Sequence, residues 1–353
     1  MSIKYKYGHY IDLPAQREML YAATCDSERR RFQAAIITNN CLAKFRGWDD
    51  NDKKESVIES IRNGRLYFST ALGYNDPYDT LMYIDKAGLL KFIEQTLAVR
   101  MPAYIESQKI KNFSVGCFAQ MYNTPQARQQ FVRCIDDRIE KLKYAIHDNI
   151  KGICLSQNYL STLMWAHYAK NHTGIALLYD TKELECARCY SYEGKVLQEK
   201  FKLCPIKYRS QRPDATAFIH DYLLSKAAGG LPVTHAGDIL SSPDYKMIKD
   251  IVLTKDVVWR YEKEVRLIPR VLDFEYMSGV AYLEIKPKAI ILGAKMSDCD
   301  RKAVIDTATE VGGITIYEAW LNDSQRDYQI VFQEYGLKDY RLRQLYNVHK
   351  CRI

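Results

Sequence analysis

The alternation of apolar and polar positions is most regular in the last third of the chain. Alternation with a period of two predicts strands, and an apolar stripe with a period near 3.6 predicts a helix. On this basis we expect a helix from about Asp298 to Val311 that ends at Gly312-Gly313. The strands predicted around it cover 257–268, 280–286, 289–293, Ile314–Trp320 and Tyr328–Phe332.

The first half of the chain alternates helical patterns with short apolar runs. Ser56–Asn63 places Val57, Ile58 and Ile61 on one helical face, and Gly64 follows as a C-terminal cap. Further helices are expected over about 13–40, Lys86–Arg100, Gln126–Asn149 and Thr162–Asn171. Short strands are expected at Cys41–Arg46, Arg65–Thr70, Phe113–Ala119, Gly152–Ser156 and Ile175–Tyr179.

Strands and helices follow one another without a regular strand–helix–strand repeat, which favours an α+β fold. We therefore expect a mixed or antiparallel sheet core with helical insertions. The predicted organisation is an N-terminal helical extension at 1–40, a single α+β domain at 41–335 and a C-terminal tail at 336–353. Within the domain we expect a helical insertion at about 80–149 and an irregular one at about 181–250, the least periodic stretch.

The segment 258–268 carries the most unusual pattern of charge. As a strand, it would place Trp259, Tyr261, Val265 and Leu267 on one face, and Arg260, Glu262, Glu264 and Arg266 on the other. Two carboxylates at this spacing lie about 6–7 Å apart. Arg266 could hold one of them ionised and leave the other to act as a base or to stabilise a cation. A solvated charged surface explains the pattern equally well.

Tyr74–Asp79 is the second unusual segment. Asp76 as a cap with Pro77 in the first turn would start a helix. That explanation leaves Asn75 unused, and the alternative is that Asn75 and Asp76 hydrogen-bond a ribose or position a loop.

The third segment is the predicted helix 162–171, where Trp165, Tyr168 and His172 share one face. Such a stripe is typical of a core, but the polar residues around it also suit a pocket in which Trp165 or Tyr168 stacks on a flat ring. His167 lies on an adjacent face, either as a structural hydrogen-bonding group or as a contact for a ligand.

Composition narrows the setting of these segments. The chain has 353 residues, a net charge of +8 and scattered basic residues, which does not favour a dedicated nucleic-acid protein. The 10 cysteines are widely spread, as in a reducing cytosol, and the 27 tyrosines suit a wet pocket or an interface. No signal peptide or apolar run of about 20 residues is evident. We therefore expect a cytoplasmic protein without a membrane span.

The motifs, taken in order, resemble the bacterial domain-of-unknown-function family numbered 2971. The resemblance covers about 41–332 and rests on Lys44-Phe-Arg46, Arg65–Thr70 with Asn75–Asp79, Leu163–Ala169 with Gly174–Asp180, Trp259–Arg266 and Ala289–Gly293. It implies a bacterial or phage-linked intracellular protein with a role in defence, and it implies no particular reaction.

A second resemblance is to the ADP-ribosyltransferase superfamily. That superfamily uses a basic residue on an early strand, a Ser-Thr-Ser or Tyr motif and a late-strand Glu, sometimes within Glu-x-Glu. Arg46, Ser69-Thr70 and Glu262-Lys-Glu264 occur here in that order. Ala71 departs from the pattern, because it stands where the final Ser of the motif would be.

The second resemblance implies roles for these residues with NAD as a substrate. Arg46 would contact the phosphates or the ribose, and Tyr168 or Trp165 would stack on nicotinamide. Glu264 would stabilise the oxocarbenium-like cation as nicotinamide leaves, and Glu262 would steer the acceptor.

These observations leave three functions open. The first is an NAD-using ADP-ribosyltransferase or NAD glycohydrolase of a defence or toxin type, with a protein or nucleic-acid acceptor and no metal. The predicted site is catalytic Glu264, Glu262 and Tyr168, with Arg46, Ser69, Asn75, Asp76, Trp165, His167 and Arg266 holding the nucleotide. The second is a metal-dependent nuclease or phosphodiesterase built from Asp76, Asp79, Glu262 and Glu264. The third is a non-catalytic module that senses a nucleotide or a protein.

Overall fold

The structure is a computed structural model that describes residues 3–4, 10–11, 40–48, 51–99, 124–198, 200–220, 244–269, 279–321 and 330–336. The strand expected at Phe113–Ala119 lies outside the described residues. The helix expected over 13–40 and the tail at 336–353 lie almost wholly outside them.

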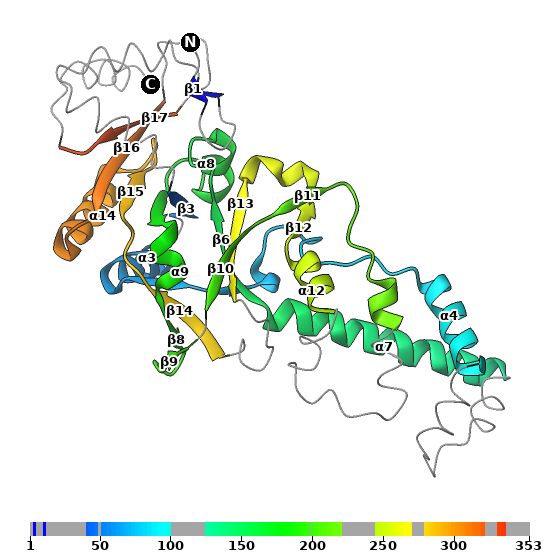
Figure 1. Ribbon diagram of the computed structural model, residues 1–353. Helices are drawn as coiled ribbons and strands as arrows, with labels where there is room; N and C mark the ends of the chain where they lie inside the picture. The colour runs from blue at the N-terminus through cyan, green and yellow to red at the C-terminus, as the bar shows by residue number, and fades with distance from the viewer. Residues whose placement is uncertain are drawn as a thin grey trace.

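A nine-stranded central sheet organises the described part of the chain (Figure 1). Its neighbouring strands are antiparallel except for β15 and β16, which run parallel. The main path of the sheet is β10 (Phe201–Pro205), β13 (Glu264–Pro269), β6 (Lys151–Ser156), β3 (Cys41–Arg46), β7 (Ile175–Asp180), β15 (Ala289–Leu292), β16 (Thr315–Leu321) and β17 (Ile330–Glu334). The short strand β5 (Ser69–Thr70) pairs with β6.

Three smaller sheets accompany the central one. The largest has four strands in the order β4 (Arg65–Tyr67), β14 (Val280–Glu284), β8 (Arg188–Ser191) and β9 (Val196–Leu197). The strands β11 (Lys207–Arg209) and β12 (Thr254–Asp256) pair in parallel, and β1 (Ile3–Lys4) pairs with β2 (Tyr10–Ile11). Helices and mixed sheets together confirm the predicted α+β class.

The helices lie around the central sheet. Those whose two ends are described are α3 (Asn51–Asn63), α4 (Lys86–Val99), α7 (Pro125–Asn149), α8 (Thr162–Tyr168), α9 (Thr181–Cys186), α12 (Asp244–Val252) and α14 (Asp298–Val311), with 3-10 helices η1 (Ala71–Gly73) and η2 (Val257–Glu262). In Figure 1 the long helix α7 runs toward α4 at one end of the molecule, and α14 lies near α3 at the other. None of the described helices combines the length and apolar character needed to cross a bilayer.

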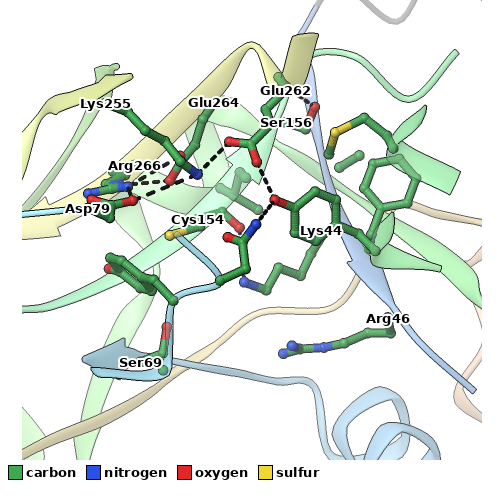
Figure 2. Close-up of a pocket in the computed structure, with 18 residues that line it drawn as sticks. Lys44, Arg46, Ser69, Asp79, Cys154, Ser156, Lys255, Glu262, Glu264 and Arg266 are labelled. Atoms are coloured by element: carbon green, nitrogen blue, oxygen red, sulfur yellow. Dashed lines mark hydrogen bonds and ion pairs between the residues drawn. The ribbon is translucent and has the colours of Figure 1, made fainter. Parts of the chain in front are cut away.

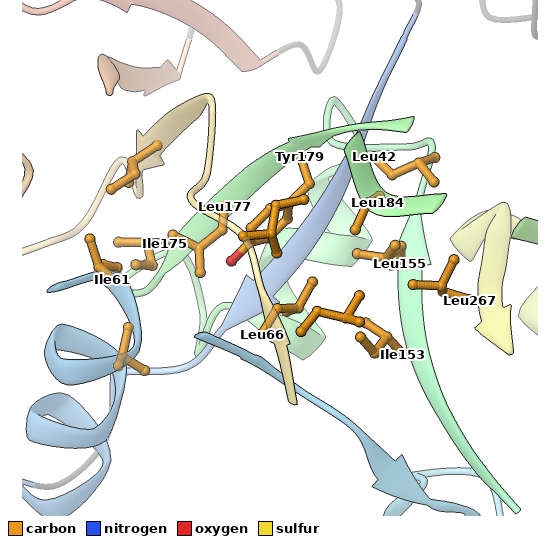
Figure 3. Packing of buried hydrophobic residues seen from close by; sticks show 14 of the residues in the cluster. Leu42, Ile61, Leu66, Ile153, Leu155, Ile175, Leu177, Tyr179, Leu184 and Leu267 are labelled. Carbon is orange, nitrogen blue, oxygen red and sulfur yellow. The ribbon is translucent and has the colours of Figure 1, made fainter. Parts of the chain in front are cut away.

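Because side chains alternate along each strand, the apolar residues of the central sheet contribute to one core cluster on each of its two faces. Leu42, Ile153, Leu155 and Leu177 point to the face covered by the four-stranded sheet, α3 and α14 (Figure 3). The opposite face packs under α8, where Trp165 is buried among strand residues. A further apolar cluster joins α7, α12 and the nearby ends of α4 and β10.

Several predicted elements are confirmed. The helix 298–311 has the predicted bounds, the predicted helices near 86–100 and 126–149 correspond to α4 and α7, and Gly64 follows α3 with a φ of 60°. The predicted strands near 152–156, 175–179 and 289–293 correspond to β6, β7 and β15.

Three local predictions are wrong. The chain over 257–268 is not one strand, because η2 covers its first half and Lys263, with a φ of 44°, separates η2 from β13. No helix begins after Asp76, whose side chain instead accepts a hydrogen bond from the Tyr78 amide within a turn. The stretch 181–250 is not irregular where it is described, since it supplies β8 to β11, and β10 belongs to the central sheet. The domain boundaries stay a prediction.

Candidate functional site

A cavity of about 360 Å³ opens where the central sheet divides (Figure 2). The strands β3 and β6 share only one register pair, Ala43 with Ser156, and separate beyond it. Side chains from β3, β6 and β13 line the resulting space together with α8, η2, β12 and the 69–79 segment. The cavity therefore collects residues from distant parts of the chain.

One wall of the cavity is a buried cluster of two basic and three acidic side chains. The ammonium of Lys255 lies 2.7 Å from Glu262, 3.4 Å from Glu264 and 3.7 Å from Asp79. The guanidinium of Arg266 lies 2.7 Å from Glu264 and 2.5 Å from Asp79. All five residues are less than one-tenth exposed. Buried charges are tolerated when they are paired in this way.

Local backbone geometry explains how two of the carboxylates converge on Lys255. Glu264 and Arg266 lie on the same face of β13 because they are two residues apart. Lys263 adopts a left-handed conformation and turns the chain, so Glu262 approaches from η2. The backbone carbonyl of Glu262 accepts a hydrogen bond of 2.5 Å from the Ser156 hydroxyl, which ties η2 to β6.

A chain of hydrogen bonds continues from the ionic cluster to the mouth of the cavity. The Tyr168 hydroxyl donates to Glu262, and the Asn75 amide donates to the Tyr168 hydroxyl at 2.6 Å. Asn75 and Asp79 flank one turn, so the same network holds the turn on both sides. Tyr168 is the member of this network that is half-buried at the cavity.

The cluster separates the protonation behaviour of its acids. Burial opposes the charge on Glu264, but Arg266 and Lys255 outweigh it and lower the pKa of Glu264 to about 2. Burial raises the pKa of Glu262 and of Asp79 above their ordinary values, against the opposing effects of Lys255 and Arg266 respectively. Burial also opposes the charge on Lys255, but Glu264 and Glu262 raise its pKa.

Lys44 and Arg46 form a basic wall on one face of β3. The Lys44 ammonium donates to the Cys154 carbonyl at 3.0 Å, and neither basic residue forms an ion pair within the part of the chain that the structure describes. Burial and the adjacent Arg46 lower the pKa of Lys44 to about 8. Two basic groups without an acidic partner suit an anionic ligand.

Apolar and aromatic side chains complete the lining. Phe45, Leu155 and Met164 border the cavity, and the ring of Tyr74 lies 4.7 Å from the Arg266 guanidinium. The cavity therefore offers an apolar surface beside both charged walls, as expected of a pocket for an organic anion.

Comparison with known families finds a match for one segment of the chain, which contributes part of this site. Residues 164–267 match the family described as "Protein of unknown function (DUF2971)". The matched segment runs from α8 to β13 and includes Tyr168, Lys255, Glu262, Glu264 and Arg266. The resemblance to this family is thereby confirmed for the segment. Neither the curated proteins nor the solved structures contain a match to the chain.

Seven of the ten predicted site residues line the cavity. Four of them, Tyr168, Glu262, Glu264 and Arg266, lie within the matched segment 164–267. The others, Arg46, Ser69 and Asn75, precede it in the chain. Ser69 donates to the Gly152 carbonyl at 3.4 Å and so joins β5 to β6 at the edge of the cavity.

Asp76, Trp165 and His167 lie elsewhere. Trp165 is completely buried, its ring packs against Phe45 at 5.3 Å, and its indole donates to the Tyr159 carbonyl, so it cannot stack on a ligand. Asp76 is buried in its turn, and His167 is exposed beside Tyr261. These three side chains shape the surroundings of the site and do not face its cavity.

The sequence did not indicate the central role of Lys255. Lys255 precedes the charged segment 258–268, and a single lysine in a short strand does not form a recognisable sequence pattern. The sequence offers Asp79 as part of a family motif and as a metal ligand, and Lys44 as part of a family motif, and it indicates no ionic role for either. Cys154 also lines the cavity, where burial raises the pKa of its thiol to about 12, so the thiol stays protonated.

The cluster bears on the metal-dependent alternative. Lys255 occupies the position between Asp79, Glu262 and Glu264 that a divalent cation would need. No group of three or more His, Cys, Asp or Glu residues suited to a metal ion occurs within the described ranges. Asp76, the fourth proposed ligand, does not line the cavity. Each of the three converging carboxylates is therefore already paired with at least one of the two protein cations, Lys255 and Arg266.

Proposed function

We propose that the protein breaks the bond between nicotinamide and ribose in NAD, as an NAD glycohydrolase or an ADP-ribosyltransferase. The observation that carries the proposal is that Glu262 with Tyr168 and the basic wall of Lys44 and Arg46 line one cavity. Departure of nicotinamide leaves positive charge on the ribose, and a carboxylate placed there stabilises it. The two phosphates of NAD are anions, for which an arginine is a suitable partner.

The contacts favour Glu262 over Glu264 as the cation-stabilising group. Both oxygens of Glu264 are engaged, one by Arg266 at 2.7 Å and the other by Lys255 at 3.4 Å. Both oxygens of Glu262 are engaged as well, one by Lys255 at 2.7 Å and the other by Tyr168. The difference lies in the partners: Tyr168 is half-buried at the cavity, whereas Arg266 and Lys255, which hold Glu264, are both buried. In this proposal Glu264 holds Lys255 and Arg266 in position, which reverses the assignment that the superfamily resemblance implies.

Lys255 and Tyr168 support this role of Glu262. Lys255 at 2.7 Å favours the ionised form of the carboxylate, against the burial that raises its pKa. Tyr168 keeps its proton because burial and Glu262 raise its pKa far above the ordinary value. A neutral Tyr168 can therefore donate to Glu262 throughout the physiological pH range.

Nicotinamide release from NAD tests the proposal. The purified protein is incubated with NAD, with and without a chelator, and free nicotinamide is followed by chromatography. We expect release that a chelator does not change, and a loss of about 10²–10³-fold or more in Glu262→Gln. Glu310→Gln is the matched control. Glu310 is an exposed glutamate on α14, it is distant in sequence from the site residues, and its side chain pairs with Arg62.

The alternatives predict different results. Turnover retained in Glu262→Gln would contradict the assignment of the carboxylate. Binding of NAD without release, detected by calorimetry, would indicate the non-catalytic sensing module. Hydrolysis of a phosphodiester that the chelator abolishes would indicate the metal-dependent alternative.

A further inference from the structure

In the proposed NAD cleavage Lys44 contributes only charge to the basic wall, and its amine takes part in no chemical step. Its strand, β3, pairs fully with β7 but separates from β6, so the side chain reaches into the opening between β3 and β6. In Figure 2 the Lys44 side chain lies between the carboxylate cluster and Arg46. Its hydrogen bond to the Cys154 carbonyl leaves the ammonium without an acidic partner in the described structure.

The groups around Lys44 favour its neutral form. Burial has the largest effect, and Arg46 adds a like charge from the same face of β3. Across the cavity Glu264 acts in the opposite direction, while Arg266 acts in the same direction as Arg46. Because Arg266 and Lys255 already neutralise Glu264, the acidic cluster only partly offsets the effect of burial.

We propose that Lys44 is a nucleophilic amine that forms an imine with small anionic aldehydes, whose anionic group Arg46 binds. The Lys44 nitrogen attacks the aldehyde carbon, and the carbonyl oxygen becomes a hydroxyl group. Loss of that hydroxyl as water leaves a carbon–nitrogen double bond. Both protons of the neutral amine leave in the water, and the step needs no oxidant or reductant. The step itself does not require NAD, although an anionic aldehyde and NAD would share Arg46 and the same cavity.

The magnitude of the effect follows from the neutral fraction of the amine. With a pKa of about 8, roughly one-tenth of Lys44 is neutral at pH 7. An exposed lysine with an ordinary pKa of about 10.4 is neutral in only about 0.04% of molecules at that pH. Lys44 should therefore present about two hundred times more neutral amine than a surface lysine, and at equal access and equal intrinsic nucleophilicity it should react faster by that factor.

Pyridoxal 5′-phosphate, an aldehyde that carries a phosphate, is the probe for this site. The full-length protein is incubated with a low concentration of the probe, the imine is reduced with borohydride, and peptides are mapped by mass spectrometry. We expect the adduct on Lys44, with a yield that rises as the pH increases through about 8. This assay on the wild-type protein does not depend on whether a variant folds.

Three variants complete the test. Lys44→Arg should carry no adduct at this position, and Arg46→Gln should need at least about tenfold more probe for the same labelling. Lys151→Arg is the matched control, since Lys151 is a buried lysine of β6 that donates to the Val280 carbonyl, and it should label as the wild type does. Labelling confined to exposed lysines would overturn the proposal. Labelling of Lys44 that is unchanged in Arg46→Gln would overturn the assigned class of ligand.

Discussion

Replacing Glu264 with glutamine removes one negative charge from the buried cluster and preserves the size of the side chain. Glu264 is 6% exposed and accepts hydrogen bonds from Arg266 and Lys255. The substitution leaves both cations buried, with Asp79 and Glu262 as their remaining acidic partners. It therefore tests whether the ionic cluster stabilises the fold.

The lowered pKa of Glu264 sets the size of the effect. The pKa falls from the ordinary value of 4.5 to about 2, and each unit corresponds to about 1.4 kcal/mol. Ionised Glu264 therefore contributes about 3 kcal/mol to the free energy of unfolding at neutral pH. Because the pKa of the folded state is the lower one, this contribution is present above about pH 4.5 and is lost as the pH falls toward 2.

Urea unfolding followed by circular dichroism measures both consequences. At pH 7, Glu264→Gln should be less stable than the wild type by about 3 kcal/mol, and the difference should narrow below about pH 4.5. Asp79 and Glu262 titrate in both proteins, so their effects largely cancel in the comparison. Glu310→Gln, which removes an exposed carboxylate 3.3 Å from Arg62, should change stability by no more than about 0.5 kcal/mol.

Two results would refute the reasoning. One is a Glu264→Gln protein as stable as the wild type at pH 7. The other is a stability difference that widens on acidification. Either would mean that Arg266 and Lys255 do not stabilise the ionised form of Glu264 in the folded protein.

Two further substitutions test the framework of the site. A Cβ at Gly174 would lie 2.1 Å from the Arg46 carbonyl oxygen. Gly174→Ala should therefore force β3 and β7 apart and lower the melting temperature by several degrees. In the control Gly279→Ala the added Cβ has no atom within 4 Å, so the melting temperature should not fall in this way. Lys255→Met removes the ammonium from among three carboxylates and should cost about 3–5 kcal/mol at pH 8 in urea unfolding. Without Lys255 the carboxylates that it contacted have raised pKa values in the folded state, so the Lys255→Met protein should recover part of this stability on acidification. A loss of stability that is independent of pH would argue against the charge-based explanation.

The order of helices and strands was largely predictable because it depends on residues close in sequence. The apolar stripe of 298–311, with Ser297 as its cap, gives α14 the predicted bounds. The prediction was wrong at 257–268, where alternation suggested a single strand. The left-handed conformation of Lys263 interrupts it there, and the Gln157 amide donates to the Lys263 carbonyl from another part of the chain.

The candidate site was predictable in part. Glu262, Glu264, Arg266 and Tyr168 stood out because charged or aromatic residues occurred where the pattern of a strand or helix did not require them. Arg46 was predicted only from the resemblance to the ADP-ribosyltransferase superfamily. Trp165 stood out for the same reason as the first four. It lies on the side of α8 that faces the sheet, so it is buried and has a packing role. A sequence pattern identifies a helical face and does not show which face is covered.

By itself, the amino-acid sequence determined the α+β class, most of the local elements and the residue types available for chemistry, since periodicity, caps and turns act over a few neighbouring positions. Only the tertiary structure decided which of those residues meet. Arg266 binds Asp79 from 187 positions away, and Tyr168 binds Glu262 from 94 positions away. The structure also decided that Glu262, Glu264 and Arg266 of the charged row are buried around Lys255, whereas Arg260 is exposed. Burial and charge pairing depend on everything packed around a group, so they control its pKa and chemistry in ways that its immediate sequence neighbours do not.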